Sequence, residues 1–168
     1  MAQTINVTGP HVINWGAGGS ATTALGRGDN NDLFRIEVSH RYADIQTNEH
    51  GESPANSVIV GVNATVHFSL VQWDTAQAAA LQAAIGGQGS GIKFPTVGRL
   101  MNNGITGDNT VSFSVVPDIS GRIGVSVSRV RLVTFNVTDF GNRASRLVVS
   151  GDILPDGDAQ NGTLFTLT

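Results

Sequence analysis

The fold class of this chain follows from one stretch of sequence, Val62-Asn63-Ala64-Thr65-Val66-His67-Phe68-Ser69-Leu70. Apolar side chains occupy every even position, and Asn, Thr, His and Ser occupy the odd positions. A period of two residues is typical of a β-strand that covers a core with one face and meets a polar environment with the other. The sequence therefore predicts a half-buried strand over residues 62–70.

The same alternation recurs on both sides of this strand. Val111, Phe113 and Val115 alternate with serines, and the apolar positions of residues 124–137 change parity midway, which predicts a bulge or a bend between two strands. Further strands are expected at 5–7, 12–15, 33–38, 147–149 and 164–167. Short strands separated by glycine-rich turns indicate a mainly β fold, a sandwich or a barrel, formed by residues 1–168 as a single domain.

One segment, residues 74–87, has the pattern of a helix. Asp74 is a good N-cap, Gln77 occupies the position of a capping-box partner, alanine fills the interior, and Gly86 follows as a C-cap. Ala78, Leu81 and Ile85 make a narrow apolar stripe. We expect one short helix over about 74–85 that flanks the sheet.

The charge composition suggests a surface that is covered by protein. Charged residues are 14% of the chain, against about 25% in an average globular domain. Lysine occurs once, at Lys93, and arginine nine times, and protein–protein interfaces are likewise poor in Lys and Glu and rich in Arg. The alternative interpretation is a free surface of uncharged Ser, Thr, Asn and Gln.

The same composition argues against several functions. The net charge is −3 and no basic cluster occurs, so no stable nucleic-acid binding is expected. Cysteine is absent, and no apolar run is long enough to span a membrane. The N-terminus has neither the basic stretch nor the apolar core of a secretory signal, so we expect synthesis in a host cytoplasm.

A search for catalytic and metal-binding motifs yields none. The four histidines, His11, His40, His50 and His67, have no metal-ligand spacing. The segments 28–32 and 152–158 are better explained by turns than by calcium loops. We therefore expect no enzyme activity, no cofactor and no metal. Trp15, Trp73 and Tyr42 leave a carbohydrate-binding sandwich as an alternative, although core or interface packing explains them better.

Five segments of residues 5–75 occur in an order known from one protein family: Thr8-Gly9-Pro10-His11-Val12, Ala24-Leu25-Gly26-Arg27-Gly28-Asp29, Phe34-Arg35-Ile36-Glu37-Val38, Asp44-Ile45-Gln46-Thr47-Asn48-Glu49-His50-Gly51-Glu52-Ser53-Pro54 and Val60-Gly61-Val62-Asn63-Ala64-Thr65-Val66. In this order they resemble the tail tube (major tail) proteins of tailed bacteriophages. Where that family often has an acidic residue followed by Gln-Tyr-Gly before the Pro, this chain has Glu49-His50-Gly51.

The resemblance implies a small β-sandwich or barrel subunit with one helix. Such subunits form hexameric rings that stack head to tail into a hollow tube, through which the genome passes. The expected partners are copies of the chain and other tail proteins, with DNA only in transit, and the expected location is the virion tail, assembled in the host cytoplasm. The alternatives within a virion are a tail terminator, a collar, a baseplate protein or a capsid decoration protein.

Two groups of residues are candidates for contacts in such an assembly. The loop over about 46–57 is the candidate stacking arm, the alternative being an ordinary hairpin loop. Asp44, Glu49, His50 and Glu52 are its candidate inter-ring contacts. Arg129 and Arg131 are two positions apart on a predicted strand and so share a face, which makes them candidate inter-subunit arginines or simply solvated side chains.

Overall fold

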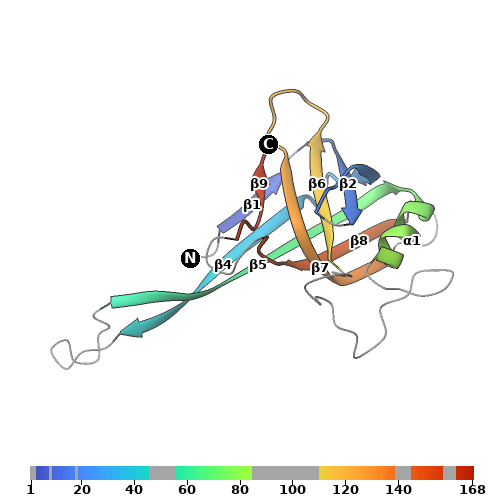
Figure 1. Ribbon diagram of the computed structural model, residues 1–168. Helices are drawn as coiled ribbons and strands as arrows, with labels where there is room; N and C mark the ends of the chain where they lie inside the picture. The colour runs from blue at the N-terminus through green and yellow to red at the C-terminus, as the bar shows by residue number, and fades with distance from the viewer. Residues whose placement is uncertain are drawn as a thin grey trace.

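The computed structural model describes residues 3–7, 9–17, 19–45, 56–84, 110–138, 145–156 and 162–168 (Figure 1). These residues are mostly strand with one short helix, as the sequence predicts. In chain order the elements are β1 (Gln3–Val7), β2 (His11–Ala17), β3 (Thr23–Gly28), β4 (Phe34–Ile45), β5 (Asn56–Trp73), α1 (Thr75–Ala84), β6 (Val111–Pro117), β7 (Val125–Thr138), β8 (Arg146–Ile153) and β9 (Thr166–Leu167).

The strands form one antiparallel sheet whose hydrogen bonding closes into a ring. The order around the ring is β5-β3-β2-β6-β7-β8, and β8 returns to pair with β5. β4 and then β1 extend the sheet from β5, and β9 adds to β7. Of the two architectures that the sequence allows, this hydrogen bonding is that of a barrel.

β5 is the strand around which the others are arranged. One of its edges pairs with β4 from Asn56 to His67 and then with β3 from Leu70 to Trp73. The other edge pairs with β8 between Ala64 and Leu70. The predicted alternation is confirmed here, because Ala64, Val66, Phe68 and Leu70 are buried. Ser69, on the other face of the strand, is buried as well.

The core fills the barrel, and aromatic rings join its two sides. The rings of Phe34 and Phe68 stack with centroids 5.5 Å apart, and Phe113 meets Phe68 edge-on at 5.1 Å. Both distances lie in the favourable range for aromatic pairs. These rings connect β4, β5 and β6, which are separated in the sequence.

The helix α1 covers one end of the barrel and packs against β2 and β3 (Figure 1). Asp74 caps it, because its Oδ1 accepts hydrogen bonds from the backbone N–H of Ala76 at 2.7 Å and of Gln77 at 3.4 Å. The predicted capping box is wrong. The backbone N–H of Asp74 donates to the carbonyl of Leu25, and the Gln77 side chain instead accepts from Trp15 Nε1 at 3.3 Å. Residues 85 and 86, part of the predicted helix end, lie outside the described residues.

The parity change predicted for residues 124–137 is present as irregularities within a single strand, β7. Its pairing register shifts opposite Val111 and Phe113 of β6, and again between Leu132 and Thr134. Each shift returns apolar side chains to the core, so Val127, Val130 and Phe135 are all buried despite their unequal spacing.

We predict that Phe68→Ala lowers the free energy of unfolding by about 3–5 kcal/mol. The substitution removes a fully buried ring that contacts two others and leaves a cavity between β4, β5 and β6. Denaturant unfolding measures the change. Val133→Ala is the control, because this exposed side chain on β7 should change stability by less than about 0.5 kcal/mol. Equal losses in both variants would contradict the assignment of the core.

Candidate functional site

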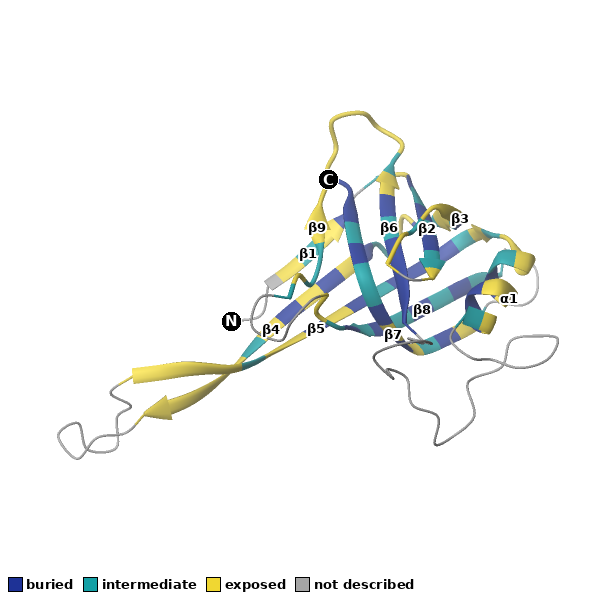
Figure 2. Cartoon of the chain, viewed as in Figure 1, coloured by how far each residue is buried: buried dark blue, intermediate teal, exposed yellow. Residues whose placement is uncertain are grey.

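Beyond the barrel, β4 and β5 continue as a two-stranded ribbon formed by residues 40–45 and 56–62, here called the arm (Figure 1). Its residues are exposed apart from His40 and Gly61, which are half-buried (Figure 2). Among the described strands, none pairs with the outer edges of these segments. The arm therefore offers unpaired backbone groups along both sides, which is the arrangement that promotes pairing with another chain.

The apolar face of the barrel continues onto the arm, where its side chains are exposed. Val38 and Ala64 are opposite each other and buried, and the next pairs on the same face are His40 with Val62 and Tyr42 with Ile59. Tyr42, Ile59 and Val62 lie on this face, and Ile45 and Val58 lie on the opposite face. With Val60 at the bulge, these six large apolar side chains of the arm are 44–57% exposed. Single exposed apolar residues are ordinary, whereas a contiguous group of this kind marks an interaction surface.

A bulge at Val60 determines which arm residues face each other. Arg41 is opposite Gly61, but Tyr42 is opposite Ile59, so Val60 is the extra residue. The shift places Ile59 on the same face as Tyr42 and brings Ser57 opposite Asp44. Ser57 Oγ then donates a hydrogen bond of 2.7 Å to Asp44 Oδ1. Because bulges increase local twist, the arm leaves the barrel as a twisted ribbon rather than a flat one.

The residues proposed from the sequence for inter-ring contact are only partly placed by the structure. Asp44 lies near the end of the arm, whereas Glu49, His50 and Glu52 lie outside the described residues. The predicted loop boundary was wrong at one end, because Asn56 and Ser57 belong to β5. Tyr42 was expected from the sequence only as a core or interface side chain, and Ile59 was not singled out. The run Val58-Ile59-Val60 favours a strand, but an apolar run ordinarily predicts burial.

Both candidate arginines of β7 make contacts within their own chain. Arg131 forms an ion pair with Asp152, its cross-strand neighbour on β8. Arg129 Nη1 donates a hydrogen bond of 3.1 Å to the carbonyl of Pro155. These contacts hold β8 and the segment that follows it against β7. An inter-subunit role for either arginine stays a prediction.

The acidic segment at residues 29–32 forms the turn that its sequence favours. The backbone N–H of Asn31 donates to Asp29 Oδ1 at 2.9 Å, which is an Asx-turn. Arg146 lies 3.1 Å from the other oxygen of Asp29, and His67 lies 3.2 Å from Asp32. Within the described ranges, no group of three or more acidic or histidine side chains is placed to hold a metal ion.

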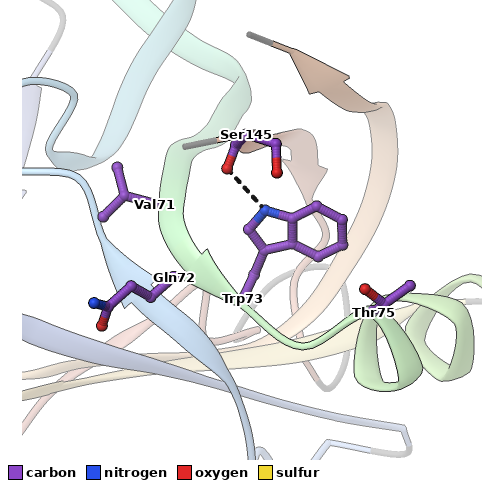
Figure 3. A pocket seen from close by; sticks show the side chains of 5 residues that line it. All are labelled: Val71, Gln72, Trp73, Thr75 and Ser145. Carbon is purple, nitrogen blue, oxygen red and sulfur yellow. Dashed lines mark hydrogen bonds between the residues drawn. The ribbon is translucent and has the colours of Figure 1, made fainter. Parts of the chain in front are cut away.

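The three aromatic residues considered for sugar binding lie apart. Trp73 lines a shallow groove with Val71, Gln72 and Thr75, and its Nε1 donates a hydrogen bond of 3.0 Å to the carbonyl of Ser145 (Figure 3). Trp15 is buried beside α1. Tyr42 is opposite Ile59 on the arm, about 45 Å from Trp73 along β5 at ~3.3 Å per residue. The structure therefore brings no aromatic platform together from these residues.

No protein-family model matches the sequence, and no curated protein is significantly similar to it. In the part of the chain that the structure describes, no helix is both long and apolar enough to cross a membrane. The functional assignment therefore depends on the arm and on the chemistry of its surface.

We predict that Ile59→Ser and Val66→Ser, two substitutions on the same strand, differ sharply in their effect on folding. Val66 is fully buried in the barrel, so a serine there should lower the free energy of unfolding by more than about 2 kcal/mol. Ile59 is half-exposed on the arm, so the change should be within about 0.5 kcal/mol. Denaturant unfolding at low protein concentration, followed by tryptophan fluorescence, measures both. A large loss in the Ile59→Ser variant would show that the arm stabilises the subunit itself.

Proposed function

We propose that this chain is a structural subunit that assembles with copies of itself through the arm, and that the assembly is the tail tube of a tailed bacteriophage. The observation that supports self-assembly is the arm, a ribbon whose two outer edges have no partner among the described strands and whose two faces both carry apolar side chains. In a free monomer, a surface of this kind promotes aggregation. When a partner covers it, the same surface stabilises the complex.

The energy available from the arm suits an assembly of many copies. Fully burying a Val, Ile or Leu side chain contributes about 1.5–3 kcal/mol, and the six apolar side chains of the arm are each about half buried already. Each arm can thus contribute several kcal/mol, before the ordering of the two chains is subtracted. A single contact of this size is modest, but the same contact repeated around a ring and between rings gives a stable particle.

The symmetry of such a contact also agrees with a tube. An arm that docks on a different surface of the next copy makes a heterologous interface, and such interfaces close into rings or continue as open stacks. The resemblance to tail tube proteins adds the specific form, hexameric rings stacked head to tail around a channel. Segments that carry the resemblance lie on the barrel and on the arm, at β2, β3, β4 and β5.

The charge of the chain is compatible with a conduit for DNA. The net charge is −3 and the basic residues are few. Few cationic side chains would therefore bind the DNA phosphates as DNA passes. The proposed partners are copies of the chain and other tail proteins, and the proposed location is the virion tail. The role is structural and includes no catalytic step and no cofactor.

Sedimentation velocity and negative-stain electron microscopy of the purified full-length protein test the proposal. We expect particles that grow with protein concentration, seen as stacked rings or hollow tubes. Single rings that never stack would instead indicate a terminator or a collar protein. A monomer at every concentration would contradict self-assembly altogether.

The double variant Tyr42→Ser/Ile59→Ser tests whether the arm is responsible. We predict that it lowers the assembled fraction at least tenfold, because it removes the central apolar pair of one arm face, while circular dichroism and unfolding stay those of the original protein. Val133→Ser is the matched control, since Val133 is equally exposed but lies on β7 away from the arm. Assembly that is unchanged in the double variant would show that another surface holds the copies together.

A further inference from the structure

His40 lies at the base of the arm, on the face of the ribbon that continues the core. The register places it opposite Val62, between the core of the barrel and the exposed pair of Tyr42 and Ile59. The centroids of the His40 and Tyr42 rings are 6.4 Å apart. His40 is half-buried in the single subunit, so water still reaches its imidazole. A partner that covers this face of the arm would remove that water.

The two faces of the arm differ in charge close to the barrel. Arg41 lies on the face opposite to His40, where a Cβ added to Gly61, its cross-strand neighbour, would be 4.0 Å from Arg41 Cδ. Asp44 shares the face of His40 but lies two pairs further out, and its Oδ1 accepts the hydrogen bond from Ser57. Next to the barrel, the face with His40 therefore combines apolar side chains with one group that titrates near neutral pH.

The strands adjacent to His40 present no charge to it in the described parts of the chain. Residues 56–66 of β5 contain no charged or titratable side chain, and neither do residues 3–7 of β1, the other strand that pairs with β4. Glu37 of β4 and Asp152 of β8 are both opposite Thr65, on the other face of the sheet. Among these strands, no carboxylate is therefore placed beside the imidazole to stabilise its protonated form.

We propose that the arm binds a neighbouring copy only while His40 is neutral, so that the assembly comes apart when the pH falls. This inference rests on the self-assembly proposed above and adds its regulation. A neighbouring copy that covers Tyr42, Ile59 and Val62 also covers the imidazole beside them and excludes water from it. Protonation would then leave a positive charge buried among apolar groups, which is strongly unfavourable.

The direction of the pH effect follows from proton linkage. The free subunit can take up a proton at His40, whereas the covered imidazole cannot. The free subunit therefore holds more protons in acid, and a falling pH shifts the equilibrium toward it. An unperturbed imidazole is half-protonated at about pH 6.5. From about pH 7.5 to about pH 5.5, the association constant of each arm contact should consequently fall about tenfold.

Sedimentation velocity of the full-length protein at about pH 7.5 and about pH 5.5 tests the proposal. We expect the protein concentration at half-assembly to rise at least about tenfold at the lower pH and to return when the pH is restored, with the same circular dichroism throughout. Equal assembly at both pH values would overturn the switch alone. Stronger assembly in acid would also overturn it and would indicate an acidic partner group at His40. A monomer at both pH values would overturn the proposed function as well.

Substitutions of single histidines identify the group that responds. His40→Gln cannot be protonated and should assemble equally at both pH values. His40→Arg carries a permanent charge and should remain unassembled at both, with the circular dichroism of the original protein. His67→Gln is the matched control, because His67 is also half-buried but lies on the barrel, 3.2 Å from Asp32. It should keep the original pH response, and so should His50→Gln. A response that persists in His40→Gln, or that disappears in His50→Gln, would overturn the assignment.

Discussion

The structure depends on the unequal lengths of β5 and β8. β5 has 18 residues and β8 has eight, so the pairing that closes the barrel begins only at Ala64, opposite Ile153. From Asn56 to Asn63 that edge of β5 has no described strand partner, while the other edge remains paired with β4. The last closing pair of the barrel is therefore also the base of the arm. The same two strands that contribute to the core therefore continue without interruption into the projecting arm.

The bulge at Val60 determines which side chains of the arm share a face. In a regular ladder Tyr42 would be opposite Val60, and Asp44 would be opposite Val58, an apolar neighbour that cannot donate a hydrogen bond. The extra residue instead pairs Tyr42 with Ile59 and Asp44 with Ser57. Apolar groups thus gather near the base of the arm on the face that continues the core, and a satisfied polar pair follows nearer its end. A single inserted residue sorts the side chains because strand neighbours alternate between faces.

Short sequence patterns predicted the individual strands and the helix. The arm, in contrast, results from how the strands pair in the folded chain. The alternation over residues 62–70, the Asp74 cap and the parity change in β7 are properties of short segments, and the structure contains all three. The capping box failed because Trp15, distant in sequence, takes the Gln77 side chain. The arm could not be predicted, because Val58-Ile59-Val60 has the composition of a buried strand. Its exposure results from where β8 ends, and no pattern within residues 56–62 encodes that. The residues proposed from the sequence at its end, apart from Asp44, lie outside the described residues.

The proposed assembly must also prevent the arm from pairing with unsuitable strands. A flat apolar ribbon with open edges would add to any exposed sheet edge and would lead to aggregation. Three features of this arm oppose that: the twist introduced at Val60, and the exposed charges of Arg41 and Asp44 on its two faces. A twisted ribbon matches only a surface of complementary shape, and a charge buried without a partner opposes every other pairing. The specificity of the contact then comes from geometry, and the apolar side chains supply its strength.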